Sequence, residues 1–249
     1  MQAVILLAGY GSRLSRDDLP HKSLLPFDGE TLLSRHLTCF ETLEVERVHL
    51  VVGYNKELVR QYVFGLNLKL DCNFIDNDLY RTTGNTLSMV MGLRQCQGDV
   101  IILDGDVLYP QRVFCDYIKN SQPTSFALVP ADIDNTESTK VLIRPDGKIE
   151  AFITKRDLTL EEKAGFDFGG EAIGFFKLSA EDRKNFIDHY ENYESKYIKV
   201  LWEIPFTDFA QSVDLNPWLI NQDLACFEID TQDDYKKALS NFLGNRDKY

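Results

Sequence analysis

The sequence has no surplus of basic residues and no long apolar segment. Its 249 residues include 27 Lys and Arg against 39 Asp and Glu, which gives a formal net charge of −12. A general nucleic-acid-binding protein needs a basic surface that displaces counterions from phosphates, so this class is excluded. The longest apolar runs, such as residues 3–8, have the length of a strand and are too short to span a membrane as a helix.

Signals of secretion and of cross-linking are also missing. The N-terminus has no basic segment followed by a long apolar one, so secretion is not indicated. The cysteines are scattered, odd in number and without a Cys-x-x-Cys pair: Cys39, Cys72, Cys96, Cys115 and Cys226. This usage is typical of reduced thiols and indicates neither a disulfide framework nor a zinc site. We therefore expect a cytoplasmic protein.

Apolar residues make up 44% of the chain, which is enough to build a core. Through about residue 130, strand patterns alternate with helical ones. Strands are expected at about 2–8, 47–52, 70–75, 99–103 and 125–130. Helices are expected at about 31–41, 56–64, 86–96 and 111–119. Such alternation predicts a mainly parallel sheet with helices on both faces.

The pattern changes after about residue 135. Two short apolar stretches, 140–143 and 148–153, flank Pro145-Asp146-Gly147, which is a hairpin signal. Further strands are expected at 174–178 and 224–229. Helices are expected after the N-cap residues Ser179 and Thr231. No linker or repeat divides the chain. We predict a single α/β domain over residues 1–249, with a Rossmann-like, mainly parallel mixed sheet flanked by helices and a β-rich C-terminal region.

The first predicted strand leads directly into Ala8-Gly9-Tyr10-Gly11-Ser12-Arg13-Leu14. Glycines directly after a buried strand let backbone N–H groups approach a phosphate closely. A dinucleotide-binding motif would need glycine at the position of Leu14 and an acidic residue after the second strand, and both are absent. A P-loop motif is absent too. On the glycines alone, a tight turn without a ligand is an equal alternative.

Two cations, Arg13 and Lys22, follow Gly9 within 13 residues. This arrangement suits a nucleoside triphosphate. Backbone amides and Arg13 would hold the β- and γ-phosphates, and Lys22 would meet the reacting α-phosphate. Either cation alone is better explained as a solvated surface charge.

Residues 3–14, followed by Pro20-His21-Lys22-Ser23-Leu24-Leu25-Pro26, resemble the nucleotidyltransferase family pattern LAAGxGxRL…PKxLL. The sequence departs from the pattern at Leu7 and at His21, and neither departure removes a phosphate-binding group. Members of this family make NDP-sugars and CDP-alcohols. The resemblance implies that Arg13 and Lys22 are catalytic. It also implies a nucleotide-binding set of Leu6, Ala8, Gly9, Tyr10, Gly11, Ser12, Arg13 and Lys22.

Later stretches resemble the phosphocholine cytidylyltransferase-like branch of this family, and they occur in the expected order. They are residues 77–80 with Asn85 and Ser88, residues 170–176, Leu201-Trp202-Glu203, and residues 228–235. The resemblance makes Asn85 and Ser88 candidates for contacts with the base or ribose. The alternative is an ordinary helix N-cap formed by Thr83 or Asn85.

Carboxylates at three places are candidate Mg²⁺ ligands. Asp104 and Asp106 follow the strand at 99–103, at the edge where open α/β sheets bind ligands. The resemblance places a metal-binding residue at Asp106, with Asp104 in support on the nucleotide side. Glu203 matches the second metal-binding carboxylate of the branch, with Glu in place of Asp. Asp230 is a third candidate, with a helix cap as the alternative.

Residues 201–235 contain eight acidic residues and no Lys or Arg. They are also rich in aromatic residues: Trp202, Phe206, Phe209, Trp218, Phe227 and Tyr235. Carboxylates among aromatic rings suit an ammonium group, as in phosphocholine, phosphoethanolamine or 2-aminoethylphosphonate. The nearby Asn216, Asn221, Gln222 and Asp223 suit a sugar phosphate, and a core of aromatic residues is a further alternative. Trp202 and Glu171 are our candidates for contacts with the acceptor.

We therefore predict a Mg²⁺-dependent cytidylyltransferase that joins CTP to a small phosphorylated alcohol or phosphonate and releases pyrophosphate. Residues 1–135 would form the NTP-binding half, and residues 136–249 would bind acceptor and metal. The alternatives are a sugar-1-phosphate nucleotidyltransferase and a non-catalytic nucleotide-binding subunit. The charge distribution fits this division, because residues 1–60 hold seven Lys or Arg against eight acidic residues and are nearly neutral. Neither a nucleic acid nor membrane insertion is expected.

Overall fold

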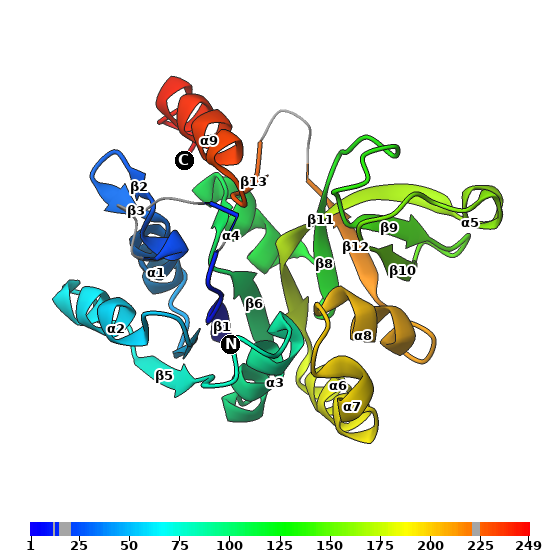
Figure 1. Ribbon diagram of the computed structural model, residues 1–249, viewed down its shortest axis with the longest axis horizontal. Helices are drawn as coiled ribbons and strands as arrows, with labels where there is room; N and C mark the ends of the chain where they lie inside the picture. The colour runs from blue at the N-terminus through cyan, green and yellow to red at the C-terminus, as the bar shows by residue number, and fades with distance from the viewer. Residues whose placement is uncertain (12, 15–20, 221–224) are drawn as a thin grey trace.

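The structure is a computed structural model that describes residues 1–11, 13, 14, 21–220 and 225–249 (Figure 1). Its first strand is β1 (Gln2–Leu7), the apolar run at the start of the sequence. Ala3 and Ile5 belong to one hydrophobic cluster, and Val4 belongs to the cluster on the opposite face. A strand buried between two layers requires apolar residues at successive positions, because neighbouring side chains point to opposite faces.

Parallel strands form the N-terminal part of the sheet. β6 (Val100–Asp104), β1, β4 (Val48–Val52) and β5 (Cys72–Asp76) lie side by side in that order. Leu6 of β1 lies opposite Asp104 of β6. Because these strands run in the same direction, their carboxyl ends share one edge, and the residues that follow them meet there.

The antiparallel part of the sheet is built around β11 (Asp167–Leu178), which pairs with β6. β11 also pairs with β8 (Ser125–Val129) and β9 (Lys140–Ile143). β10 (Ile149–Ile153) continues the sheet beyond β9, and β12 (Asn216–Leu219) adds a parallel pairing with β8. In the part of the chain described, nine strands thus form one mixed sheet. The predicted α/β fold with a β-rich C-terminal region is confirmed.

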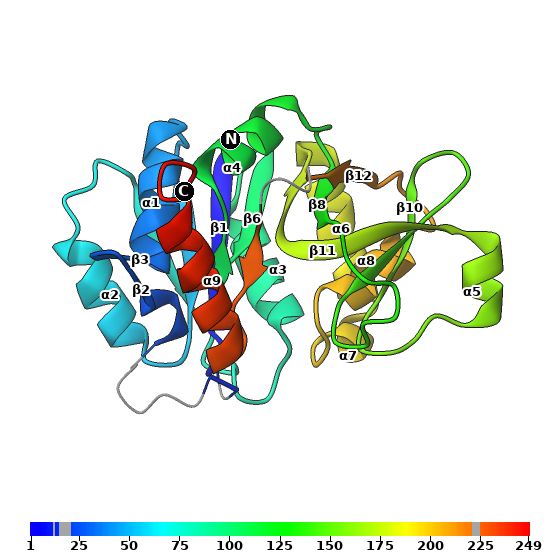
Figure 2. The same ribbon diagram turned by 90° about the horizontal axis from the view of Figure 1, so that it is seen from above.

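Helices cover both faces of this sheet. The hydrophobic cluster on one face includes residues of α3 (Asn85–Gln95), α6 (Ala180–Asn192), α7 (Glu194–Tyr197) and α8 (Glu203–Phe209). The cluster on the other face includes residues of α1 (Leu32–Thr42), α2 (Lys56–Gly65) and α4 (Gln111–Asn120). Both views place α5 (Leu160–Gly165) and α2 at opposite ends of the molecule (Figures 1 and 2). No described helix is long and apolar enough to cross a membrane.

The C-terminal segment returns to the N-terminal part of the molecule. β13 (Phe227–Glu228) pairs antiparallel with β7 (Val107–Leu108), just beyond the end of β6. The N–H of Ile229 donates to the backbone carbonyl of Asp106 at 3.1 Å. These contacts bring Asp230 to the carboxyl edge of the parallel strands.

The final helix, α9 (Gln232–Gly244), packs against the segment after the first strand. That segment forms the short 3₁₀ helix η1 (Lys22–Leu24) and a hairpin of β2 (Pro26–Phe27) and β3 (Glu30–Thr31). Phe27 packs edge-on against two aromatic rings of α9, at centroid distances of 5.5 Å. The segment after β1 and the helix α9 are therefore held together by a small hydrophobic cluster.

The strands and helices predicted up to residue 153 are present. The predicted caps are confirmed, because the side chains of Ser179 and Thr231 accept hydrogen bonds from Asp182 N–H and Asp234 N–H. The strand predicted at 174–178 is only the end of the longer strand β11. The pairing register shifts near Gly170, which has φ +117°, and this irregularity interrupts the strand pattern in the sequence. The short helix α8 was missed, since its buried aromatic residues and Pro205 show no amphipathic period.

Candidate active site

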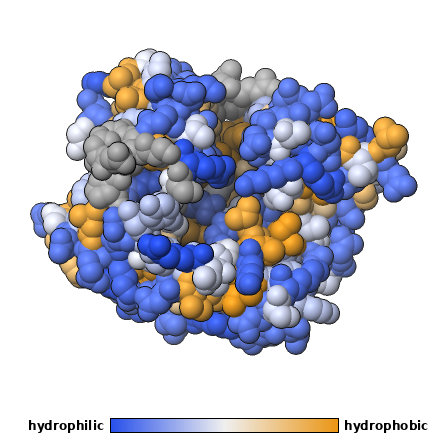
Figure 3. Space-filling model, viewed as in Figure 1, coloured by the Kyte–Doolittle hydropathy of each residue, from blue (hydrophilic) through white to orange (hydrophobic). Residues whose placement is uncertain are grey.

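A cavity of about 370 Å³ opens at the carboxyl edge of β1 and β6. Figure 3 shows the hollow in the middle of the face seen in Figure 1. Its wall combines this edge and the start of α3 with residues from the C-terminal part of the chain. The predicted site residues in the wall are Leu6, Ala8, Gly9, Gly11, Arg13, Lys22, Asn85, Ser88, Asp104, Asp106, Glu203 and Asp230.

The loop after β1 leaves its backbone open to the cavity. A Cβ added at Gly9 would meet no atom within 4 Å. Gly11 has φ +65°, which L side chains rarely adopt, and a Cβ added there would lie 3.4 Å from the Cβ of Lys22. A side chain at Gly11 would therefore strain the backbone of the loop, although the contact with Lys22 would be an ordinary one. Ser12, also predicted to bind the nucleotide, lies outside the described residues.

Two cations and two carboxylates meet beside this loop. The Nζ of Lys22 lies 2.6 Å from Oδ2 of Asp106 and 2.7 Å from Oδ1 of Asp230. The Nη2 of Arg13 lies 2.7 Å from Oδ2 of the same Asp230. The structure thus brings together four predicted residues that are up to 217 positions apart in the sequence.

The charges of this group perturb one another. Burial alone would lower the pKa of Lys22, but the charges of Asp106 and Asp230 outweigh burial and raise it. Burial alone would raise the pKa of Asp230, but Lys22 and Arg13 outweigh that effect and lower it. Both groups are therefore held in their charged forms, as phosphate binding and metal binding require.

Asp104 is hydrogen-bonded to Trp202, a core residue of the C-terminal part of the chain. Its Oδ2 accepts a hydrogen bond of 3.1 Å from the indole Nε1 of Trp202. Burial, followed by the charge of Asp106, raises the pKa of Asp104 well above its usual range. Trp202 is 2% exposed, and its ring packs with aromatic side chains of the core. Trp202 is not part of the described cavity wall, so the predicted contact between its ring and the acceptor stays a prediction.

Glu203 is 9% exposed and faces the cavity at the start of α8. Its Oε1 accepts a hydrogen bond from the Thr139 hydroxyl at 3.3 Å. Its Oε2 is buried and has no hydrogen-bond partner among the described residues. Burial raises the pKa of Glu203 to about 7. A buried carboxylate oxygen without a partner costs free energy, so the site suits a ligand that donates a hydrogen bond there.

Glu228 was not among the predicted site residues, although it lines the cavity. Its Oε1 accepts a hydrogen bond from the N–H of Gly174 at 3.1 Å. The side chain lies at the surface of the cavity wall. Desolvation of its carboxyl group, followed by the charges of Asp106 and Asp104, raises the pKa of Glu228 well above its usual range. Strand alternation was the available signal, because Ile229 is fully buried while the acidic residues on either side of it face the cavity.

The N-terminus of α3 forms another part of the wall. Gly84 is the N-cap of α3. The alternative that Thr83 or Asn85 serves only as the N-cap of this helix is therefore wrong. Oδ1 of Asn85 instead accepts a hydrogen bond of 2.9 Å from the backbone N–H of Trp202. The hydroxyl of Ser88 accepts one of 2.9 Å from Asn77 Nδ2. The side chains of Asn85 and Ser88 thus line the cavity and also make hydrogen bonds within the protein.

Two further predicted residues lie outside the described wall. Tyr10 is 56% exposed and packs edge-on against Tyr54, with ring centroids 4.5 Å apart. Glu171 lies on β11 between Val129 of β8 and Lys140 of β9, and it is partly buried. Glu171 is not part of the described cavity wall, and its predicted contact with the acceptor stays a prediction. The wall instead includes Lys155, which the sequence prediction missed.

The predicted metal ligands are only partly brought together. The described residues contain no group of three or more His, Cys, Asp or Glu side chains positioned to hold a metal ion. Asp106 and Asp230 converge on Lys22, whereas Glu203 bonds to Thr139. The set of three carboxylates is thus not assembled. The pair Asp106 and Asp230 offers the oxygen ligands that Mg²⁺ prefers.

Over residues 3–148 the sequence matches the MobA-like NTP transferase domain family. The chain belongs to this family. Members of the family are nucleotidyltransferases, so the predicted family is confirmed. A choline-phosphate cytidylyltransferase from Haemophilus influenzae is 25% identical over 253 residues, which cover 100% of both chains. A bifunctional protein GlmU from Methanococcus vannielii is 32% identical over 145 residues, with 54% of this chain and 33% of that protein covered.

Solved structures share the fold of this NTP transferase. The CTP:phosphocholine cytidylyltransferase LicC from Streptococcus pneumoniae has a TM-score of 0.72 and 18% identity, with 97% of this chain and 98% of that chain covered. A UDP-glucose pyrophosphorylase in complex with UDP-glucose has a TM-score of 0.75 and 14% identity, with 98% and 99% covered. The fold is thus common to proteins named for different acceptors.

Proposed function

We propose that this protein transfers a cytidylyl group from CTP to a small phosphorylated alcohol or phosphonate and releases pyrophosphate. The observation that carries the proposal is the group of Arg13, Lys22, Asp106 and Asp230 beside the open glycine loop. The reaction brings two anions together, so a site for it must supply positive charge to phosphates and oxygen ligands to a metal. The similarity to the choline-phosphate cytidylyltransferase from Haemophilus influenzae supports CTP as the nucleotide.

The transfer is an in-line displacement at the α-phosphorus. An oxygen of the acceptor's phosphate or phosphonate forms the new bond to this phosphorus. The bond to the bridging oxygen of the β-phosphate breaks, and pyrophosphate leaves with the electron pair. Lys22 would stabilise the charge on the α-phosphate, and Arg13 would hold the leaving phosphates. Asp106 and Asp230 would hold Mg²⁺, which would neutralise phosphate charge when bound.

The part of the wall that includes Lys155 and Glu203 is our candidate for the acceptor site. The Lys155 ammonium would pair with the acceptor's phosphate. The unpartnered Oε2 of Glu203 would accept an N–H from a primary ammonium group, which has three such donors. A quaternary ammonium has no N–H and relies on aromatic faces, and the ring of Trp202 lies in the core. These observations favour phosphoethanolamine or 2-aminoethylphosphonate over phosphocholine.

A sugar-1-phosphate is the second candidate acceptor. The likeness to GlmU and to a UDP-glucose pyrophosphorylase favours it. The wall also includes Glu137 and Thr139, whose oxygens accept hydrogen bonds from sugar hydroxyls as readily as from an ammonium.

The test is a pyrophosphate-release screen of the intact protein with Mg²⁺. CTP, UTP, GTP and ATP are each combined with phosphoethanolamine, 2-aminoethylphosphonate, phosphocholine, glycerol phosphate and sugar-1-phosphates. We expect turnover with CTP and an acceptor that carries a primary ammonium. Turnover with sugar phosphates alone would overturn the acceptor assignment. Absence of turnover with every pair would overturn the catalytic function in favour of a nucleotide-binding subunit.

Matched variants connect any activity to this site. We expect Lys22→Ala to lower kcat/KM by about 10²- to 10³-fold, the usual effect of removing a group that stabilises transition-state charge. Asp106→Asn should remove Mg²⁺-dependent turnover and leave the fold intact. Lys56→Ala is the control, because this lysine pairs with Asp76 and Asp78 on the outer surface and lies outside the described wall. Loss of activity in the control would show that the assay reports on stability and not on the site.

A further inference from the structure

The imidazole of His21 connects the end of β1 to the turn that carries Lys22. Its Nε2 lies 3.0 Å from the backbone carbonyl oxygen of Leu7, the last residue of β1. Its Nδ1 lies 2.9 Å from the hydroxyl oxygen of Ser23 and 3.3 Å from the backbone nitrogen of Ser23. His21 is 4% exposed, so these bonds are largely shielded from water.

These partners define the protonation state of the ring. A carbonyl oxygen only accepts hydrogen bonds, so Nε2 carries the proton that is donated to Leu7. Nδ1 is then unprotonated and accepts from the N–H of Ser23, which makes His21 the N-cap of η1. The Ser23 hydroxyl can donate to the same nitrogen, whereas a second proton on Nδ1 would remove the acceptor of the Ser23 N–H. Burial lowers the pKa of His21 to about 4, in agreement with a neutral ring.

The two bonds of the ring have different consequences for Lys22. The bond to Ser23 shapes the turn itself, whereas the bond to Leu7 fixes this turn relative to β1. Lys22 is the next residue after His21, and its Nζ reaches Asp106 and Asp230 across the cavity edge. The glycine loop starts directly after β1. The position of the lysine relative to the loop therefore depends on the bond between His21 and Leu7.

We propose that His21 is a positioning residue for nucleotidyl transfer, because its neutral, Nε2-protonated imidazole holds Lys22 in register with the glycine loop. This inference rests on the proposed function for its kinetic part only. An error of about 1 Å in the placement of a reacting group costs up to about 10²-fold in rate. His21 also lines the cavity, but both of its ring nitrogens are engaged by Leu7 and Ser23, so it would act on kcat through Lys22.

Two substitutions separate the two bonds. In His21→Asn, a short side-chain oxygen replaces Nδ1 and caps η1, but no donor reaches Leu7. In His21→Gln, the longer side chain brings an N–H donor to Leu7, but the cap is lost. We expect H21N to lower kcat at least about tenfold, with the Kd for CTP nearly unchanged, and H21Q to keep kcat within about threefold of the wild type.

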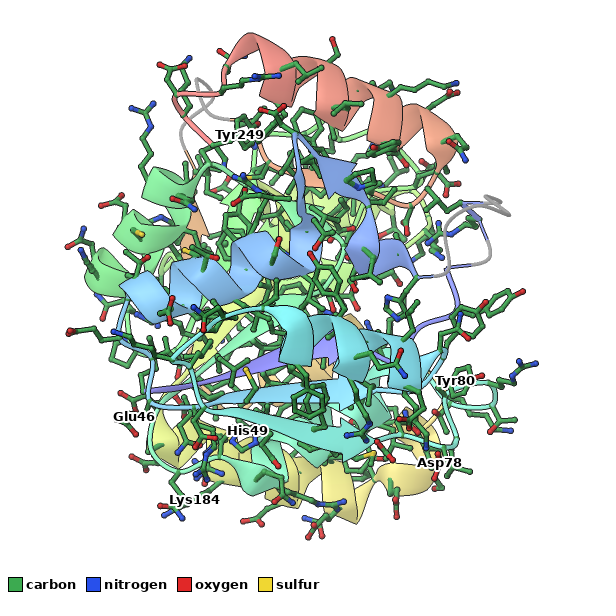
Figure 4. The ribbon with its side chains drawn as sticks, turned by 90° about the vertical axis from the view of Figure 1, so that its left-hand side faces the viewer. Glu46, His49, Asp78, Tyr80, Lys184 and Tyr249 are labelled. Carbon is green, nitrogen blue, oxygen red and sulfur yellow. The ribbon has the colours of Figure 1, made fainter. Side chains whose placement is uncertain are left out.

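A matched control is His49→Asn. His49 is 1% exposed and has hydrogen-bond partners on both ring nitrogens, Gln2 and Asn73. It lies within the sheet, well away from Tyr80 of the cavity wall in the view of Figure 4. We expect H49N to lower stability and to leave kcat unchanged. If H21N keeps the wild-type kcat, or if kcat falls in all three variants in proportion to their loss of stability, the proposal is overturned.

Two measurements by NMR test the proposal without turnover. The ¹⁵N shifts of the His21 ring at pH 7 should show the neutral ring with its proton on Nε2. The ¹⁵N chemical shift of the Lys22 ammonium group should differ between H21N and the wild type, because Nζ no longer lies between the two carboxylates. A charged ring, a proton on Nδ1 or an unchanged Lys22 ammonium shift would overturn the proposal. Absence of turnover in the wild type would overturn only the proposed function.

Discussion

The indole nitrogen of Trp202 donates a hydrogen bond of 3.1 Å to Asp104, a residue 98 positions earlier in the sequence. Through this bond, the helix α8 in the C-terminal part holds a carboxyl group at the end of β6. The backbone N–H of Trp202 also donates to Asn85 at the start of α3. Trp202 therefore connects the end of β6, the start of α3 and α8 from behind the cavity wall.

Replacement of Trp202 by Phe tests this role. The ring remains in the core, but the donor to Asp104 is lost. We expect the free energy of unfolding to fall by about 2 kcal/mol, from one hydrogen bond and some packing, and the acceptor KM to change less than about threefold. Urea unfolding and steady-state kinetics measure the two effects. Phe176→Leu is the control for packing alone. A tenfold rise in the acceptor KM at unchanged stability would return Trp202 to the acceptor site.

The pairing of Lys22 and Arg13 with Asp106 and Asp230 predicts that nucleotide and metal bind cooperatively. Phosphates compete with the carboxylates for the cations, and Mg²⁺ competes with the cations for the carboxylates. Bound phosphates therefore free the carboxylates for Mg²⁺, and bound Mg²⁺ frees the cations for phosphate. We expect Mg²⁺ to increase CTP affinity at least about tenfold.

Asp230→Asn isolates this coupling. The variant frees Arg13 and leaves Lys22 with Asp106 alone, so metal-free CTP should bind more tightly than to the wild type. The additional effect of Mg²⁺ should shrink. Isothermal titration calorimetry with EDTA and with Mg²⁺ measures both quantities. If metal-free CTP binds the variant no more tightly than it binds the wild type, the carboxylates do not compete with phosphate for the cations.

Glu203 predicts a pH dependence of stability. Its pKa is raised to about 7 by burial, whereas the unfolded chain has the usual value near 4.5. Between these values the folded protein holds a proton that the unfolded chain has released, so stability falls as pH rises through this window. One pKa unit corresponds to about 1.4 kcal/mol, so the loss is on the order of 3 kcal/mol.

Glu203→Gln has no such proton and serves as the comparison. The free energy of unfolding of both proteins is measured in urea between pH 4.5 and 8. Asp104 and Glu228 titrate in both proteins, so most of their contribution to the pH dependence cancels in the difference. We expect the variant to gain about 3 kcal/mol relative to the wild type as pH rises across this window. A difference in stability that stays constant with pH would show that Glu203 is ionised throughout.

Gly84 predicts a strict steric requirement at the start of α3. A Cβ added there would lie 1.9 Å from the carbonyl oxygen of Val200, an impossible contact with backbone. We expect Gly84→Ala to cost at least about 3 kcal/mol and to weaken nucleotide binding, because the start of α3 must move. Gly65→Ala is the control, since a Cβ there meets no atom within 4 Å. Equal thermal unfolding midpoints for the two variants would refute the close approach.

Local sequence determined much of this protein. Some features depend only on residues close together in the sequence, so their patterns predicted them. They are the apolar run of β1, the glycines after it, the caps at Ser179 and Thr231, and the cations Arg13 and Lys22. The family pattern added Asp106, which follows a parallel strand at the edge where such sheets bind ligands, and Glu203. Asp230 was a further candidate, with a helix cap as the alternative. These features predicted the fold and the phosphate-binding side of the cavity.

Only the tertiary structure decided what each remaining side chain meets. The direction of Trp202, the unpartnered oxygen of Glu203, and the places of Lys155 and Glu228 depend on packing between segments far apart in the sequence. A carboxylate or a ring has the same sequence signal whether it faces a cavity or the core. The difference is set by burial and by hydrogen-bond partners, which exist only once β13, α8 and the parallel strands have come together.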